Sequence, residues 1–227
     1  MKKLKTILPI MFLPYSLVSC TNIANYYLKG TKINSNINVI DGDTVSFLEN
    51  DKKKYIRLFG IDTPETFKND NKKLAKFENY YAHQARIFLN HIIRNKELFY
   101  KFIKYDKYNR IIAILYYKTG KNEYTDAGLE LVKNGYARVH YISDSPTDKY
   151  GVNEKNLIEY FYKLKKEENK TKMNLVNIWK HNQRHVFYKY SLTKQKAPQV
   201  NLRRFLLPFV KIWVSKLKKK GFYIIYD

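Results

Sequence analysis

Residues 39–45 read VIDGDTV and residues 56–65 read IRLFGIDTPE, and these two stretches decide the fold. Both consist mainly of β-branched and apolar residues, which favour strands, and acidic residues interrupt both of them. The first stretch predicts a strand over residues 37–47 that is broken at residues 41–43. The second predicts a strand over residues 55–62.

The connection between these strands, residues 49–53 (ENDKK), predicts a hairpin. A hairpin lays the start of the first strand beside the end of the second. We therefore expect Asp43 and Asp62 to meet at one rim of the sheet, with Glu65 just beyond them. Converging carboxylates without a nearby His or Cys form a hard, oxygen-only site, which suits Ca²⁺ or Mg²⁺ better than Zn²⁺ or copper.

These acidic residues also have a plainer interpretation. Asp-Gly is a common turn dipeptide, and residues 62–65 can form a strand exit followed by a helix cap. Spacing alone leaves both interpretations open. Arg57 favours a ligand site, because an arginine between Ile56 and Leu58 in a strand must be paired or must face a ligand.

Together the two stretches resemble the signature halves of the thermonuclease family, the staphylococcal-nuclease-like enzymes. Residues 106–110 (DKYNR) are similar to the segment that carries the family's second catalytic arginine, and residues 175–179 (LVNIW) to its closing helix segment. The resemblance covers residues 37–179 in the family's order and at near-family spacings. Four ordered pieces are specific, whereas a lone Asp-Gly-Asp-Thr is not.

The resemblance implies an α+β fold of the OB type, a closed five-stranded barrel with about three helices. The spacing of apolar residues predicts the elements along the chain. We expect helices over residues 79–94, 122–132 (capped by Asn122) and 153–172, and further strands over residues 98–105, 111–117 and 136–142.

Phosphodiester hydrolysis sets chemical requirements that the matched positions can meet. A negative phosphate repels the attacking water, so a catalyst needs a cation, further positive donors and a group that orients water. The resemblance implies that Asp43, Asp62 and the carbonyl of Thr63 hold Ca²⁺, in preference to Mg²⁺. It implies that Asp41 acts through a bound water.

The resemblance also assigns roles to two arginines and a glutamate. Arg57 and Arg110 would clamp the phosphate with bidentate forks, and Glu65 would be the general base or the group that orients the water. The family cuts the 5′ P–O bond of DNA and RNA and leaves 3′-phosphorylated ends. Three further positions match family residues that contact the substrate's phosphate and base: Lys107, Tyr108 and Tyr141.

The sequence departs from the family at three positions. Asn109 replaces the glycine before the second arginine, and we expect the turn to survive because Asn tolerates the left-handed conformation. Ser143 replaces a second substrate-side tyrosine, which puts part of the binding energy or the base preference in question. Gln84 replaces a helix glutamate, which affects stability more than chemistry.

The charge balance restricts the class of partner. The 227 residues include 43 Lys and Arg against 20 Asp and Glu, a formal net charge of +23, and 44% are hydrophobic. This length and apolar content allow one packed domain with appendages. The positive charge favours nucleic acid or an anionic membrane surface, and no protein partner is predicted.

The N-terminus predicts export. A basic start and a short apolar stretch indicate that residues 1–19 are a signal peptide, because a spanning helix needs about 20 apolar residues. Residues 17–20 (LVSC) resemble a bacterial lipobox, which implies a lipid on Cys20, the only cysteine. A plain secretory signal and a buried thiol are the alternatives. Residues 20–36 would then be a tether that holds the protein on the extracytoplasmic face of the membrane, with partial secretion as an alternative.

Residues 181–227 lie outside the resemblance and form a basic C-terminal extension. Apolar residues recur at helical spacing from Leu202 to Leu217 among lysines and arginines, and Pro208 would kink or start this helix. Such a helix can lie on an anionic membrane, bind nucleic acid or pack on the domain, and the pattern does not distinguish these three roles.

The sequence therefore predicts a Ca²⁺-dependent nuclease domain over residues 37–180 in a lipid-anchored protein. We expect it to hydrolyse DNA and RNA with little sequence preference. Two alternatives remain from other functional classes. One is a non-catalytic OB-fold that only binds nucleic acid, and the other is an adhesion lipoprotein in which the basic extension is the working part.

Overall fold

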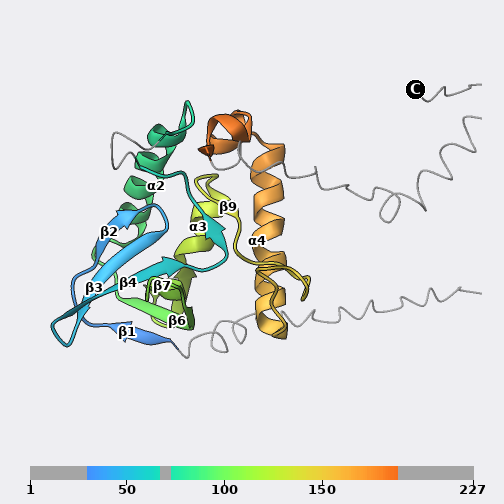
Figure 1. The fold of residues 1–227 in the computed structure, drawn as a ribbon. Coiled ribbons are helices and arrows are strands. Elements are labelled where there is room, and N and C mark those ends of the chain that lie inside the picture. Colours follow the sequence, from blue (N-terminus) through green and yellow to red (C-terminus); the bar gives the residue numbers. More distant parts are fainter. Residues whose placement is uncertain (1–29, 67–72, 189–227) are drawn as a thin grey trace, which may run out of the picture. The chain divides into compact units, whose positions relative to one another are not determined.

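A computed structural model describes residues 30–66 and 73–188, and all of them belong to one compact unit, Met1–Tyr188 (Figure 1). The predicted signal peptide (1–19) and Cys20 lie outside the described residues. So does the predicted amphipathic helix of the extension, residues 202–217. No helix in the described part of the chain is long and apolar enough to cross a membrane.

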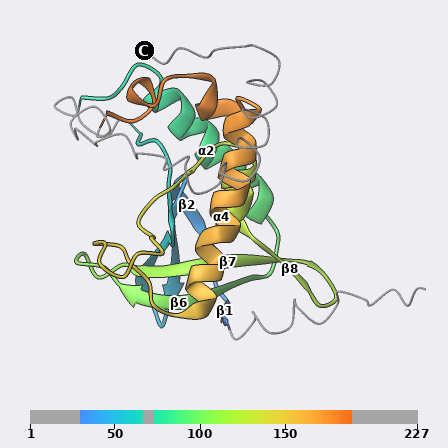
Figure 2. The same ribbon diagram turned by 90° about the vertical axis from the view of Figure 1, so that its right-hand side faces the viewer.

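A mixed sheet of seven strands forms the body of the domain. The strands follow the order β1-β6-β7-β4-β3-β2, and β8 pairs with the far end of β7 (Figure 2). β4 and β7 pair in parallel, and β5 and β9 form a separate two-stranded sheet. The strands are β1 Thr31–Ile33, β2 Asn38–Asp41, β3 Thr44–Glu49, β4 Lys52–Leu58, β5 Ile61–Asp62, β6 Leu98–Tyr105, β7 Ile111–Gly120, β8 Glu123–Asp126 and β9 Arg138–Val139.

The predicted α+β class is confirmed, but the sheet is not closed into a barrel. Its outermost strands, β1 and β2, pair with β6 and β3 and not with each other. The sheet has more strands than the five expected, partly because β7 is ten residues long. One edge of β7 pairs with β4 along its first half and with β8 along its second half.

Two tight hairpins bring the first predicted stretch beside the second. β2 turns into β3 at Gly42 and Asp43, and β3 turns into β4 at Asn50 and Asp51. The φ angles of Asn50 and Asp51 are 50° and 59°, as two-residue hairpin turns of type I′ require. The predicted hairpin is therefore confirmed, and it pairs Thr44 directly with Arg57.

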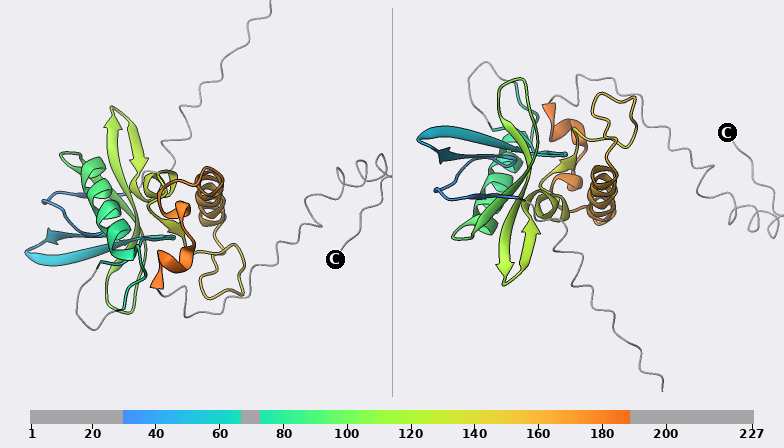
Figure 3. Two further views of the ribbon diagram at one scale, coloured as in Figure 1. Left: turned by 90° about the horizontal axis from the view of Figure 1, so that it is seen from above. Right: turned by 90° about the horizontal axis from the view of Figure 1, so that it is seen from below.

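The described residues form three α-helices: α2 (Glu78–Ile93) and α3 (Ala127–Lys133) pack on the sheet, and α4 (Lys155–Met173) packs on α3 and β9. The view from above shows α3 between α2 and α4 (Figure 3). Each helix turns an apolar side inward, and the fully buried residues include Leu89 of α2, Leu131 of α3 and Leu164 of α4. Two short 3₁₀ helices follow, η1 Asn177–Lys180 and η2 Gln183–His185.

One predicted helix starts later than expected. Asn122 is not its cap but lies in the turn before β8, and the helix begins at Ala127. The cap is Asp126, whose side chain accepts a hydrogen bond from the amide of Leu129 at 3.0 Å. Residues 123–126 instead pair with β7, because Tyr124 and its β-branched neighbour Thr125 favour a strand.

The domain also extends beyond both of its expected ends. Thr31–Ile33, in the stretch expected to be a tether, forms β1 and pairs with β6. Residues 181–188, expected to begin the extension, belong to the packed domain, where Val186 and Phe187 are buried. We call residues 181–188 the C-terminal arm.

Candidate active site

Asp43 lies in the tight turn between β2 and β3 and is 2% exposed. The glycine before it is required by packing against α2. A Cβ on Gly42 would lie 2.6 Å from the Cβ of Ala85 and 2.9 Å from the hydroxyl of Thr63. Ala85 of α2 and Thr63, which follows β5, therefore both lie too close to this turn for residue 42 to carry a side chain.

Arg57 joins the two predicted carboxylates. Its Nη1 donates to Oδ1 of Asp43 at 2.9 Å, and its Nη2 donates to Oδ1 of Asp62 at 3.0 Å. Asp43 also accepts hydrogen bonds from the Thr63 amide at 3.1 Å and the Thr44 hydroxyl at 3.0 Å. The structure thus brings together Asp43 and Asp62, which the hairpin predicts to meet, and shows that Arg57, expected to be paired or to face a ligand, is paired with both of them.

Burial and neighbouring charges set the protonation of this cluster. Burial raises the pKa of Asp43, the Arg57 charge opposes it, and the Asp62 charge raises it further; the result lies above the ordinary 3.8. Burial works to lower the pKa of Arg57. The charges of Asp43 and Asp62, with smaller contributions from Tyr141 and Glu65, outweigh it and raise that pKa. Arg57 therefore stays charged.

Arg138 is a site residue that the sequence analysis missed. It pairs with Asp62 across β5 and β9, and its Nε and Nη2 donate to Oδ2 of Asp62 at 3.1 and 2.8 Å. Asp62 therefore sits between two guanidinium groups. A signal was present, because Arg138 lies between Ala137 and Val139 in an apolar run, as Arg57 does in its own strand.

The segment after β5 carries the predicted base. Glu65 contributes to the electrostatic field at Arg57, which places it near that guanidinium. Asp41 is held by the hydroxyl of Thr66, which donates to its Oδ1 at 2.9 Å. Glu65 therefore acts electrostatically on Arg57, and Asp41 is linked through Thr66 to the same segment after β5.

Arg110 is held within its own hairpin. Its Nε and Nη2 both lie 2.7 Å from Oδ2 of Asp106, whose Oδ1 accepts the amides of Tyr108 and Arg110 at 2.9 Å. Asn109 has φ of 59°, so the expected left-handed turn is confirmed. Tyr108 is 67% exposed and lies under both Arg110 and Lys107, 5.5 and 4.8 Å from its ring centre.

Tyr141 lies beside Arg57. The Arg57 guanidinium lies 5.2 Å from its ring centre, and Tyr150 packs edge-on at 5.1 Å. Burial raises the pKa of Tyr141 to about 12, with a further contribution from the Asp62 charge. The amide of Ser143, where the family has a second tyrosine, donates to the carbonyl of Tyr150 at 2.9 Å.

The donor set fits a hard divalent cation. Across residues 30–66 and 73–188, no group of three or more His, Cys, Asp or Glu side chains is placed to hold a metal ion. A cation would therefore bind to Asp43 and Asp62 with oxygens from the backbone, such as the Thr63 carbonyl, and from water. Two carboxylates with neutral oxygens match the preference of Ca²⁺.

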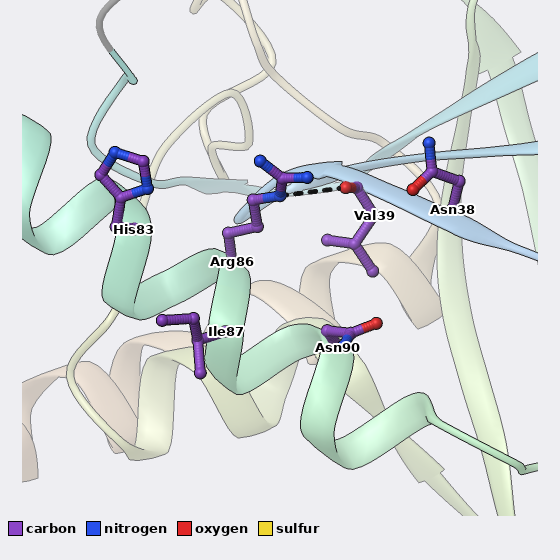
Figure 4. Close-up of a pocket in the computed structure, with 6 residues that line it drawn as sticks. All are labelled: Asn38, Val39, His83, Arg86, Ile87 and Asn90. Atoms are coloured by element: carbon purple, nitrogen blue, oxygen red, sulfur yellow. Dashed lines mark hydrogen bonds between the residues drawn. The ribbon is translucent and has the colours of Figure 1, made fainter.

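A separate hollow of about 330 Å³ lies between β2 and α2 (Figure 4). Arg86 crosses it, and its Nε donates to the carbonyl of Val39 at 3.2 Å. None of the predicted site residues lines this hollow. Its lining consists of Asn38, Val39, His83, Arg86, Ile87 and Asn90.

Comparison with known proteins identifies the relatives of this chain. Residues 55–181, more than half of the chain, match the family model described as staphylococcal nuclease homologue. The chain is 33% identical over 123 residues to the uncharacterized protein MJ1439 of Methanocaldococcus jannaschii, a match that covers 48% of this chain and 58% of that protein.

Two relatives carry names that state an activity. Endonuclease YncB of Bacillus subtilis is 29% identical over 143 residues, which cover 62% of this chain and 58% of the relative. A thermonuclease of Staphylococcus hyicus is 29% identical over 145 residues, which cover 63% of this chain and 73% of the relative. The chain thus spans little more than half the length of the first two relatives.

Proposed function

The chain belongs to the staphylococcal nuclease family, and from that premise we propose that it is a nuclease that hydrolyses phosphodiester bonds. We further propose Ca²⁺ dependence, action on both DNA and RNA with little sequence preference, and 3′-phosphorylated products. The observation that carries the proposal is the Arg57 fork on Asp43 and Asp62, with Glu65 beside it.

The arginines meet the electrostatic requirement of phosphoryl transfer. Charge builds on the phosphoryl oxygens in the transition state, and a planar guanidinium offers two parallel donors to such oxygens. Arg57 supplies one donor group from the rigid sheet, and Arg110 supplies a second from the hairpin. A guanidinium is not deprotonated in proteins, so both groups carry positive charge.

Glu65 fits the role of water-orienting base. A carboxylate accepts a hydrogen bond from water and draws its proton as the oxygen attacks phosphorus. Its place beside Arg57 brings this acceptor next to the phosphate-binding group. When bound at Asp43 and Asp62, Ca²⁺ would supply positive charge that stabilises the developing charge on the phosphate.

The substrate surface fits a single nucleic-acid strand. Exposed Tyr108 offers a face for base stacking, and Lys107 next to it offers a charge for phosphate. Stacking of this kind tolerates any base, which supports low sequence preference. The net charge of +23 supports a polyanionic substrate.

We also propose that a lipid on Cys20 anchors the protein to the extracytoplasmic face of the membrane. The LVSC sequence at residues 17–20 after an apolar stretch supports this proposal. Metabolic labelling with a radioactive fatty acid tests it, with Cys20→Ser as the control that should remove the label. Labelling that survives Cys20→Ser would contradict the anchor.

Cleavage of single-stranded DNA by the purified full chain, in Ca²⁺ and then in excess chelator, tests the nuclease. We expect Ca²⁺-dependent cleavage that Arg57→Ala and Glu65→Ala abolish. Arg86→Ala is the control, since Arg86 is also a hydrogen-bonded arginine but is exposed and lies at the separate hollow. Tight, salt-sensitive binding without cleavage would instead indicate a non-catalytic nucleic-acid binder.

Deletion of residues 189–227 separates the nuclease from an adhesion protein. The deletion begins after the C-terminal arm, because residues 181–188 are part of the packed domain. Retained cleavage with lost attachment to surfaces would assign adhesion to the extension. Unchanged attachment would remove the adhesion alternative.

A further inference from the structure

We propose that the C-terminal arm positions Asp62 for metal binding by holding Arg138 in place. This inference rests on the proposed function, since it concerns a predicted ligand of the cation. The family match ends at residue 181, so most of the arm lies beyond it. The arm is therefore a feature of this chain that its family membership does not assign.

The contact that carries the inference is the stack of Arg138 on Phe187. The Arg138 guanidinium lies 3.8 Å from the ring centre of Phe187, which is 3% exposed. The same guanidinium donates twice to Oδ2 of Asp62. A flat ring under a planar guanidinium restricts its rotation, so Phe187 fixes the direction of both donors.

Backbone hydrogen bonds hold Phe187 in turn. Its amide donates to the carbonyl of Gln183 at 2.9 Å, and the side chain of Gln183 donates to the carbonyl of Ile178 at 2.9 Å. The residue before it, Val186, is fully buried. The ring is thus part of a folded turn and not of a loose end.

The arm is also attached to the segment that precedes α2. The Phe77 amide donates to the His185 carbonyl at 2.8 Å, and the Phe77 ring stacks on His181 at 4.1 Å. Buried Glu78 accepts the amide of Tyr188 at 2.9 Å. These contacts join the arm to the start of α2, which lies 110 residues earlier in the chain, and keep Phe187 under Arg138.

The consequence for Asp62 is a fixed carboxylate plane. Arg57 holds its Oδ1 and Arg138 holds its Oδ2, so the side chain has little freedom to rotate. Groups that orient a metal ligand in this way typically change metal affinity by about 10- to 100-fold when they are removed. We therefore expect the arm to contribute to affinity without touching the cation.

Removal of Arg138 itself would give a mixed result. It would loosen Asp62, which lowers Ca²⁺ affinity, but it would also remove a positive charge next to the site, which raises it. Phe187→Ala avoids this conflict because it keeps every charge and removes only the stacking ring. Val186→Ala is the matched control, since Val186 is equally buried but offers no ring to Arg138.

The experiment measures binding of Ca²⁺ alone to the full chain by titration calorimetry, with thermal unfolding of the metal-free protein alongside. We expect Phe187→Ala to weaken Ca²⁺ binding about 10-fold and Phe187→Tyr to restore it. Val186→Ala should lower the unfolding temperature while Ca²⁺ affinity stays within about 2-fold of that of the unaltered chain. Hydrogen exchange at Nε of Arg138, followed by NMR, should quicken in Phe187→Ala only.

Three outcomes would overturn the inference, and one of them also concerns the proposed function. Unchanged Ca²⁺ affinity in Phe187→Ala, or an equal loss in Val186→Ala, would show that the arm stabilises the fold without positioning Asp62. In either case the unaltered chain would still bind Ca²⁺ and cleave, so the proposed function would stand. Absence of both Ca²⁺ binding and cleavage in the unaltered chain would overturn the two proposals together.

Discussion

The two predicted catalytic arginines are held in opposite ways. Arg57 lies near the end of β4 with 14% of its side chain exposed, and its partners Asp43 and Asp62 come from other parts of the fold. Arg110 lies at the end of a hairpin with 29% of its side chain exposed, and its partner Asp106 is four residues away. One arginine depends on the whole fold and the other on a single turn.

The difference bears on movement as well as stability. Arg57 cannot turn away without leaving two nearly buried carboxylates without their shared donor, which is costly in a low-dielectric environment. Arg110 can exchange Asp106 for a phosphate at little cost, because both side chains are partly solvated. We infer that Arg57 sets the position of the phosphate and that Arg110 adapts to it.

Arg57→Ala should have the largest effect of any change at the site. Loss of a bidentate donor to the transition state is expected to lower kcat by about 10³-fold or more. It should also lower the free energy of unfolding by about 3 kcal/mol, because Asp43 loses its ion pair. Cleavage kinetics and urea unfolding check both values, and Arg57→Lys tests whether charge without the fork suffices.

Arg110→Ala should separate activity from stability. We expect kcat to fall about 10²-fold while the free energy of unfolding changes by less than about 1 kcal/mol, because its ion pair with Asp106 is partly exposed. The same two assays apply. A loss of stability as large as that of Arg57→Ala would contradict the distinction between the two arginines.

Glu168→Gln tests how much the contacts between distant parts of the chain, such as those that hold Arg57 and Arg138, contribute to stability. Glu168 of α4 accepts the amide of Val139 at 2.8 Å and so holds β9, the strand of Arg138. Loss of this charged acceptor should cost about 2 kcal/mol at pH 7, measured by urea unfolding.

The same variant predicts a pH dependence. Burial raises the pKa of Glu168, but Lys165 and Lys172 lower it more, so it lies below the ordinary 4.5. A depressed pKa stabilises the fold above pH 4.5, and this contribution is lost as the pH falls through the lower value. The stability difference from Glu168→Gln should therefore shrink below pH 4.5. A constant difference would show that the charge of Glu168 is not involved.

Asn109→Gly and Asn109→Ala test the single turn that holds Arg110, and they should have the smallest effects on stability. Since φ of Asn109 is 59°, alanine should cost about 1 kcal/mol, whereas glycine should leave stability within about 0.5 kcal/mol. Thermal unfolding measures both. Equal effects of the two changes would mean that the turn relaxes to another conformation.

Features set by local sequence were predictable. The Asn-Asp turn, the hairpin that pairs Thr44 with Arg57, and α2 follow from turn chemistry and apolar spacing, and the structure has them near the expected residues. The helix expected from Asn122 failed because both a turn and a cap suit Asn. The open edges of the sheet could not be predicted from the sequence either, since strand pairing depends on contacts between distant residues.

The site divides in the same manner. The meeting of Asp43 and Asp62 was predictable because one hairpin creates it, and the place of Arg57 between two apolar residues indicated that it would be paired or face a ligand. Arg138 was not identified: its apolar neighbours indicate a paired arginine, but its partner lies 76 residues away and the local sequence does not reveal the pairing of β5 with β9. The sequence explained Gly42 as a turn residue, but in the structure a Cβ at this position would clash with Ala85.

The stack of Arg138 on Phe187 has a consequence for the order in which the site is completed. The N-terminal part of a chain leaves the ribosome first, so the hairpins that carry Asp43 and Arg57 emerge long before residue 187. The last guanidinium contact of Asp62 can settle only when the final turn of the domain has left the ribosome. A partly synthesised chain therefore holds its acidic residues without the finished arrangement that the complete domain provides.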